Sequence, residues 1–170
     1  MPIPRKLLRG TNRSYDIERL IVMKPAHSAT PSERVLFGLR LPPWQRPACW
    51  TDEQQARLIE SILMGLGCGY YVTNGMDWDS DGAPLPMAGW LLDGQQRITA
   101  IRDFIAGDVA IFDGMSWKDL SEREKRSFLR EPFPCHELDY TSDEAVLLDL
   151  YDRLNFGGTP HSIEDRHPVR

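Results

Sequence analysis

The stretch WLLDGQQRITAI, residues 90–101, joins a short apolar run to a helical pattern through an Asp-Gly turn. Apolar side chains then recur at helical spacing as far as Gly107, so we expect a helix that begins at Gln95 and Gln96. The first backbone N–H groups of a helix have no partner within the helix and lie at the positive end of its dipole. The layout therefore predicts an anion site at the start of this helix, where Arg97 adds a bidentate donor.

The same residues also fit a purely structural role. Asp93 would then cap the helix, Gly94 would form the turn, the glutamines would be solvated, and Arg97 would pair with a carboxylate. Strand–turn–helix junctions that contain Asp and Gly are common. The pattern alone therefore leaves both interpretations open.

Two further segments place polar residues in a defined setting. In LPPWQRPACW, residues 41–50, two prolines stiffen the chain, so that Gln45 and Arg46 present an amide and a guanidinium at a fixed place. The alternative is that the two tryptophans anchor the core and Gln45 and Arg46 form a surface turn. YDRLNFGGTP, residues 151–160, follows an amphipathic pattern, and its Asn155 is also a candidate for the C-terminal end of that helix.

These three segments, in this order, resemble the DGQQR family, the N-terminal domain of GmrSD-type modification-dependent restriction enzymes, which is placed in the ParB/sulfiredoxin superfamily. Residues 93–99 are similar to the family signature, residues 41–50 to its Pro-aromatic-Gln-Arg…Trp element, and residues 151–160 to its Arg-hydrophobic-Asn…Gly-Thr element. The resemblance covers residues 17–166. It implies an α+β, ParB/sulfiredoxin-like fold and a nucleoside triphosphate site that the third element approaches.

The resemblance also implies roles for individual residues. Asp93 and Arg97 would be catalytic, and the nucleotide-binding residues would be Gln45, Arg46, Gly94, Gln95, Gln96, Arg97 and Asn155. Asp93 needs a physical explanation, because a carboxylate beside a helix N-terminus competes with phosphate for the same field. A Mg²⁺ ion between Asp93 and the phosphates resolves the conflict. Otherwise Asp93 caps the helix and binding relies on Arg46 and Arg97.

Length and composition fit one domain. The chain has 170 residues, of which 41% are hydrophobic, enough for a single core over residues 17–170. Residues 1–16 contain Arg5, Lys6, Arg9 and Arg13, and we expect them to form a flexible basic arm. The net charge of −5 argues against a protein that holds DNA through a global basic field, so any DNA contact must be local.

The cysteines and the hydropathy pattern indicate the cellular setting. Cys49, Cys68 and Cys135 show no close pairing, and we expect all three to be buried as small hydrophobic residues in a reducing compartment. The sequence has no apolar stretch long enough to span a bilayer. We therefore expect a cytoplasmic protein without membrane contact, in the host cytoplasm if a phage encodes it.

Local patterns predict an α+β domain with a small mixed sheet and packed helices. Capping boxes at Thr51 and Ser121 open two helices, and a third opens at residues 141–144 and ends at the glycines 157 and 158. The expected strands are 70–73, 90–92, 109–112 and 133–138, of which the first two are expected to be neighbours.

We therefore expect a domain that binds and hydrolyses a nucleoside triphosphate with Mg²⁺, in a DNA-directed system such as restriction or phage–host conflict. A nuclease or another protein subunit is the expected partner, because family members often carry an HNH-type nuclease module. One alternative is a metal-dependent DNA-nicking endonuclease that uses Asp93. The other is a non-catalytic module in which nucleotide or DNA binding regulates a partner protein.

Overall fold

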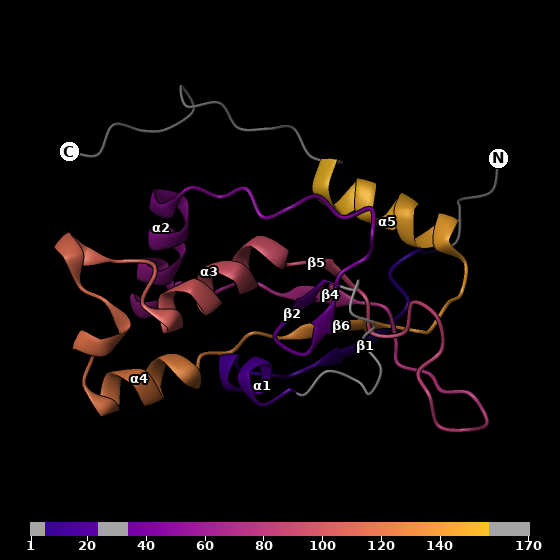
Figure 1. The fold of residues 1–170 in the computed structure, drawn as a ribbon, viewed down its shortest axis with the longest axis horizontal. Helices are drawn as coiled ribbons and strands as arrows, with labels where there is room; N and C mark the ends of the chain where they lie inside the picture. Colours follow the sequence, from indigo (N-terminus) through magenta and orange to yellow (C-terminus); the bar gives the residue numbers. More distant parts are fainter. Residues whose placement is uncertain (1–5, 24–33, 157–170) are drawn as a thin grey trace.

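A four-stranded mixed sheet lies at the centre of the computed structural model, which describes residues 6–23 and 34–156 (Figure 1). The strand order is β1-β6-β4-β5; β4 and β6 are parallel, and the other two pairs are antiparallel. The predicted α+β class and the predicted pairing of the strands before and after the residue 74–89 loop are therefore confirmed. The strands are β1 Gly10–Arg13, β4 Tyr71–Thr73, β5 Leu91–Asp93 and β6 Cys135–Leu138.

Helix α5, Glu144–Phe156, covers one face of the sheet (Figure 1). Its Leu147 and Leu150 are buried against Val72 and Leu92. Side chains alternate between the two faces along a strand, and these two strand residues point to the face that α5 covers. The amphipathic pattern expected here is confirmed: Leu147, Leu150 and Tyr151 are buried, while Leu154 is half-buried and packs against the same cluster. The glycines predicted to end this helix lie outside the described residues.

The larger core lies on the other face of the sheet. Tyr71, Leu91 and Cys135 point into it from the strands. The helices that close this core are α1 Ile17–Val22, α2 Asp52–Leu63, α3 Gln95–Ala106 and α4 Glu122–Leu129. Phe104 of α3 and Phe128 of α4 stack edge to face with a ring-centroid distance of 5.6 Å.

The short elements show where local patterns fell short. The β2–β3 hairpin, Val35–Leu36 and Leu39–Arg40, and helix α1 were not predicted. The strand expected at residues 109–112 is absent: Ile111 forms only an isolated bridge with Met115, and two short 3₁₀ segments follow, η1 Phe112–Gly114 and η2 Trp117–Asp119. Asp113 has a φ of 61°, so the chain turns back before it can pair with another strand.

The N-terminal segment also differs from expectation. Residues 10–13 fall inside the predicted arm, but they form β1, which pairs with β6 along its length. Arg13 Nε donates to a Glu137 carboxylate oxygen at 2.9 Å. This part of the predicted arm is therefore an edge strand of the sheet. Among the helices in the described part of the chain, none has the length and apolar character needed to cross a membrane.

The capping box predicted at Thr51 is confirmed and gives a first testable result. Thr51 Oγ1 accepts from Gln54 N at 3.3 Å, and Gln54 Oε1 accepts from Thr51 N at 2.9 Å. Thr51→Ala is expected to lower the free energy of unfolding by about 1 kcal/mol, because it leaves a helix N–H without its acceptor. Urea unfolding measures the loss, and Thr51→Ser is the matched control because it keeps the hydroxyl. Equal losses in both variants would contradict the assignment.

Candidate functional site

The junction between β5 and α3 depends on one glycine. Gly94 has a φ of 100° and occupies the N-cap position of α3. A Cβ atom on Gly94 would lie 2.5 Å from Cβ of Tyr71, so this position excludes a side chain. The interpretation in which Asp93 caps the helix is therefore wrong. No side chain caps α3, and its first N–H groups face the space in front of the helix.

Asp93 and Arg97 form an ion pair beside that N-terminus. Arg97 Nη2 donates to Asp93 Oδ2 at 2.8 Å and to the Tyr70 carbonyl at 2.8 Å. The expectation that Arg97 pairs with a carboxylate is confirmed, and the carboxylate is Asp93. Arg97 Nε is buried and has no hydrogen-bond partner among the described residues. A buried donor in that state is expected where a ligand or an ordered water supplies the acceptor.

Residues 42–50 are held against the same junction by Gln96. Its Oε1 accepts from the backbone N–H of Cys49 at 3.0 Å and from that of Trp50 at 3.2 Å. Gln96 was expected to bind nucleotide, and in this structure its amide fixes the neighbouring loop. This contact explains how a segment some fifty residues upstream reaches the start of α3.

The tryptophans of this loop are structural anchors. Trp44 stacks edge to face with Trp90 and Tyr151, at centroid distances of 6.1 and 5.0 Å, and its Nε1 donates to Glu144 at 2.9 Å. Trp50 packs against the larger core. The anchor interpretation of the tryptophans is confirmed, and it does not exclude a binding role for the residues between them. A rigid loop is what a binding residue requires.

The segments meet at one small cavity of about 160 Å³. All eight residues predicted for the site line it: Gln45, Arg46, Asp93, Gly94, Gln95, Gln96, Arg97 and Asn155. Two lining residues were not in the predicted set, Trp50 and Tyr151. Trp50 also packs against the larger core, and Tyr151 is buried with its ring against Trp44, so nothing in the sequence pattern separates their lining role from their packing role.

Gln45 is the least expected feature of this cavity. Gln45 is only 4% exposed, and its Oε1 has no hydrogen-bond partner among the described residues. Amide oxygen and nitrogen exchange places by a flip of the side chain, so the unpaired end offers either an acceptor or a donor. A buried amide oxygen without a protein partner is expected where a ligand or an ordered water completes it.

Asn155 lines the cavity from helix α5. Its Nδ2 donates to the Tyr151 carbonyl one turn earlier, at 2.9 Å, so the side chain lies along its own helix. Helix α5 runs to Phe156, and the residues after it lie outside the described part of the chain, so the role of Asn155 at the C-terminal end of the helix stays a prediction. The contact fixes the Asn155 amide beside Tyr151 on the wall of the cavity.

The charge of the cavity bears on metal binding. Among the described lining residues, Asp93 carries the carboxylate, and Arg46 and Arg97 carry the positive charges. The described residues contain no group of three or more His, Cys, Asp or Glu that would hold a metal ion by themselves. Mg²⁺ commonly binds through one or two carboxylates, water and substrate phosphates, so Asp93 fits that ion only together with a phosphate ligand.

None of the three cysteines lines the cavity, and two of them are buried. Cys68 and Cys135 are buried as expected, and burial raises the pKa of the Cys68 thiol to about 11 and raises the pKa of Cys135 as well. Cys49 was expected to be buried, but it is exposed. It lies in the loop that Gln96 holds, where its N–H donates to Gln96 Oε1 at 3.0 Å and its Sγ accepts from Gln96 Nε2 at 3.7 Å.

The fold and the site together define a class: a small α+β domain with a polar, arginine-containing pocket at an uncapped helix N-terminus. The chain belongs to the family described as GmrSD restriction endonuclease, N-terminal domain, whose model matches residues 30–165. Comparisons with curated proteins and with solved structures gave no match. The placement of this fold in the ParB/sulfiredoxin superfamily stays a prediction.

Proposed function

We propose that this domain binds a nucleoside triphosphate at the cavity in front of α3 and hydrolyses it, as part of a DNA-directed restriction system. The DNA setting is supported by the family, which is that of a restriction endonuclease domain. The observation that carries the nucleotide proposal is convergence. Gln45 and Arg46 line the same cavity as residues 93–97, although the two segments lie far apart in the sequence.

The chemistry of the cavity favours phosphate groups. The uncapped start of α3 offers backbone N–H donors, and Gly94, whose left-handed backbone makes the turn into the helix, lines the cavity beside them. Arg46 and Arg97 add charge, which a triphosphate needs for neutralisation. Drug-sized ligands usually occupy pockets of roughly 300–1,000 Å³. A volume of about 160 Å³ therefore fits the phosphate groups, with the nucleoside along the opening.

The hydrolytic step is assigned to Asp93 and Arg97. Mg²⁺, held by Asp93 and the phosphates, would supply charge neutralisation at the transferred phosphoryl group. Arg97 is fixed by two hydrogen bonds, to Asp93 and to the Tyr70 carbonyl, so its guanidinium is already oriented. A donor that is oriented before the reaction stabilises developing charge without further reorganisation.

A second candidate function is favoured by the Asp93–Arg97 ion pair itself. A carboxylate whose oxygen already accepts from an arginine at 2.8 Å has a structural role without any metal. The domain would then bind nucleotide without turnover and regulate a partner protein. The third possibility, metal-dependent DNA nicking, requires acidic ligands beside Asp93, which the described lining residues do not supply. Plasmid nicking with Mg²⁺ tests it directly.

Nucleotide binding is expected to raise the thermal midpoint of the chain. A triphosphate at 100 times its dissociation constant adds about 2.7 kcal/mol to the free energy of unfolding. Arg46→Gln is expected to lose most of this shift, because Arg46 lines the cavity and is exposed. Arg57→Gln, which removes an exposed arginine of α2, is the matched control and should keep the shift.

The measurement is a thermal-shift and phosphate-release screen of the four common ribonucleoside triphosphates, with and without Mg²⁺. A shift in the wild type that Arg46→Gln loses and Arg57→Gln retains supports the site. The nucleotide proposal is rejected if none of the four triphosphates shifts the wild type with Mg²⁺ present. A shift without phosphate release supports the non-catalytic function.

A further inference from the structure

Helix α4 presents arginines on the face that points away from the core. Arg123, Arg126 and Arg130 are exposed, whereas Phe128 of the same helix is 1% exposed and packs inside. At about 100° per residue the three arginines fall within roughly 60° of one another, on the side opposite Phe128. Arg130 belongs to this arrangement because its backbone keeps helical angles at the C-cap.

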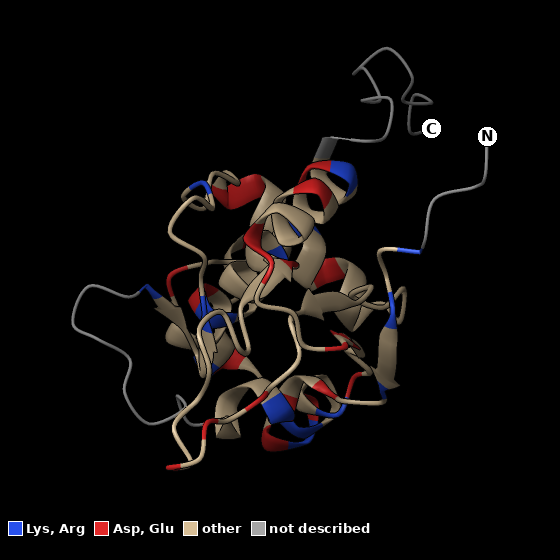
Figure 2. Cartoon of the chain, turned by 90° about the vertical axis from the view of Figure 1, so that its right-hand side faces the viewer, with Lys and Arg blue, Asp and Glu red and all other residues tan. Residues whose placement is uncertain are grey.

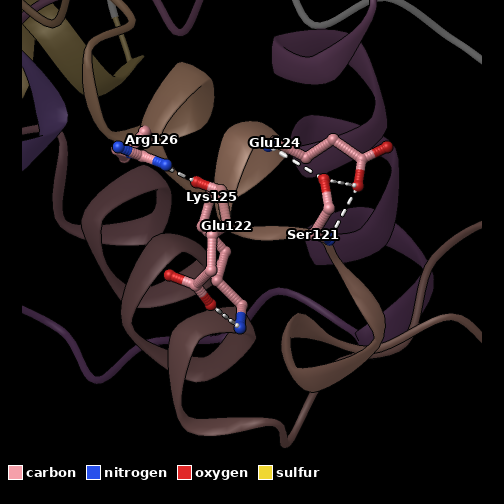
Figure 3. Close-up of polar contacts among 5 residues, drawn as sticks. All are labelled: Ser121, Glu122, Glu124, Lys125 and Arg126. Carbon is pink, nitrogen blue, oxygen red and sulfur yellow. Dashed lines mark hydrogen bonds and ion pairs between the residues drawn. The ribbon is translucent and has the colours of Figure 1, made fainter.

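The acidic residues of α4 are already engaged with other groups. The Glu124 carboxylate accepts from the Ser121 N–H and hydroxyl, and Glu122 accepts from Lys125 Nζ at 2.9 Å (Figure 3). The hydrogen bond from Lys125 lowers the pKa of Glu122, and that from Ser121 lowers the pKa of Glu124. These carboxylates are therefore charged but turned toward their own partners.

The three arginines do not share such partners. Arg126 Nε donates to the main-chain carbonyl of Glu122 at 3.1 Å (Figure 3). Within residues 6–23 and 34–156, no salt bridge is formed by Arg123, Arg126 or Arg130. Basic and acidic segments alternate over much of the chain (Figure 2), and the whole chain carries a net charge of −5. A concentration of three arginines on one helix face is therefore a local exception.

The arginines also border a hollow that an extended ligand can follow. Arg123, Arg126, Ser127 and Arg130 line an open depression of about 440 Å³, with Glu131 at its edge. Ser127 adds a hydroxyl to this lining, and Glu131 is the opposing charge among these lining residues. The depression thus keeps a net positive charge.

We propose that this arginine face, Arg123, Arg126 and Arg130, binds the phosphate backbone of double-stranded DNA. From Arg123 to Arg130 the helix rises about 10 Å. Successive phosphates of one DNA strand rise about 3.4 Å each, so four successive phosphates, with three steps between them, span a similar length. Guanidinium groups match phosphate oxygens in bidentate geometry. Contacts to phosphate position a protein on DNA without reading its sequence.

The inference deepens the proposed function, and it rests on the DNA-directed part of that function. It does not depend on the nucleotide cavity, because α4 lies away from the junction of β5 and α3 (Figure 1). A local face of this kind also reconciles DNA contact with an acidic chain. Neutralised phosphates release counterions, so few contacts suffice for measurable binding at low salt.

The test is the triple variant Arg123→Gln, Arg126→Gln, Arg130→Gln. Binding to a fluorescein-labelled 24-base-pair duplex is followed by fluorescence anisotropy between 20 and 200 mM KCl. At 50 mM KCl the dissociation constant is expected to rise at least tenfold. The slope of log affinity against log salt is expected to become shallower by about 2.7, since each phosphate contact contributes about 0.9.

The matched control removes the same charge elsewhere: Arg57→Gln, Arg102→Gln, Arg153→Gln. Arg102 and Arg153 form ion pairs with Asp103 and Asp149, so their charges are balanced locally. This control is expected to keep the wild-type salt slope within about one phosphate contact. If control and triple variant lose affinity equally, net charge and not the α4 face explains binding, and the proposal is overturned.

Further outcomes are decisive in the same way. Absence of duplex binding by the wild type at 20 mM KCl overturns the proposal, and so does binding of a single-stranded RNA of equal length in place of the duplex. Should the triple variant fail to fold by circular dichroism, Arg123→Gln alone must reduce the slope by about 0.9. The triphosphate thermal shift of the wild type is recorded alongside. If no shift is seen, the nucleotide proposal is contradicted and the DNA result still stands.

Discussion

Asp93→Asn is expected to lower phosphate release by about 100-fold or more, while the chain still binds triphosphate. A factor of 100 corresponds to about 2.7 kcal/mol of lost transition-state stabilisation. The substitution keeps the size of the side chain and removes its charge, so it removes the candidate Mg²⁺ ligand. It also weakens the ion pair to Arg97, whose two side chains are 22% and 28% exposed. The pair is part-buried, but Asn keeps an oxygen that accepts from Arg97 Nη2, so the fold should persist.

The two candidate functions differ in the phosphate release that they predict, whereas both keep triphosphate binding in this variant. If Asp93 acts in turnover, release falls and binding remains. If the domain only binds nucleotide, Asn at this position removes a negative charge from the phosphate site, and binding is unchanged or tighter. Release is measured per chain, and binding with a fluorescent triphosphate.

Asp103→Asn is the matched control for this experiment. Asp103 belongs to α3, the helix that follows Asp93, and also forms an ion pair, with Arg102 at 2.6 Å, but it does not line the cavity. It should keep wild-type phosphate release. Unchanged release in the Asp93 variant would remove Asp93 from the catalytic step.

The parts of the structure that the sequence predicted well are those that depend on residues close together in the chain. The β5–α3 junction was predicted because an apolar run, a glycine and a helical pattern follow one another within twelve residues. Both predicted capping boxes are confirmed for the same reason, since the serine or threonine and the residue three positions later recognise each other across a single turn. Such interactions are encoded by spacing alone.

Long-range pairing explains most of what was not predicted. The edge strand β1 pairs with β6, although more than a hundred residues separate them. Gln96 contacts the backbone of Cys49 and Trp50, which lie 47 and 46 residues away in the sequence. Local spacing does not reveal such a contact, and the Gln96 amide was therefore expected to bind a ligand. A short segment such as residues 109–112 has strand character, yet it forms a strand only where a partner is present.

The identity of the cap shows how one dihedral angle changes the meaning of a motif. An Asp before a Gly and a helix favours the carboxylate as cap. Because Gly94 takes a φ of 100°, it occupies the N-cap position itself, and Asp93 becomes the last residue of β5. The carboxylate is then free to meet Arg97 one turn along. Periodicity does not reveal such a backbone angle.

Gly94→Ala is expected to destabilise the fold by about 3 kcal/mol and to abolish triphosphate binding. A left-handed backbone costs a residue with a side chain about 1–2 kcal/mol. The new methyl group would also lie 2.5 Å from Cβ and 3.2 Å from Cα of Tyr71. Tyr71 is 1% exposed, and its strand β4 is paired with β6, so it cannot move aside. Overpacking of this kind costs about 1–3 kcal/mol more.

The other end of the same helix provides the control. Gly107 has a φ of 88°, and a Cβ atom added there would meet no atom within 4 Å, so Gly107→Ala carries the backbone cost alone, about 1–2 kcal/mol. Urea unfolding compares the two variants, and the triphosphate thermal shift reports the cavity. The Tyr71 contact predicts a larger loss at Gly94, with binding lost there and kept at Gly107. Equal destabilisation, or retained binding in Gly94→Ala, would show that the junction tolerates a side chain and that close approach to the α3 N–H groups is not what the site uses.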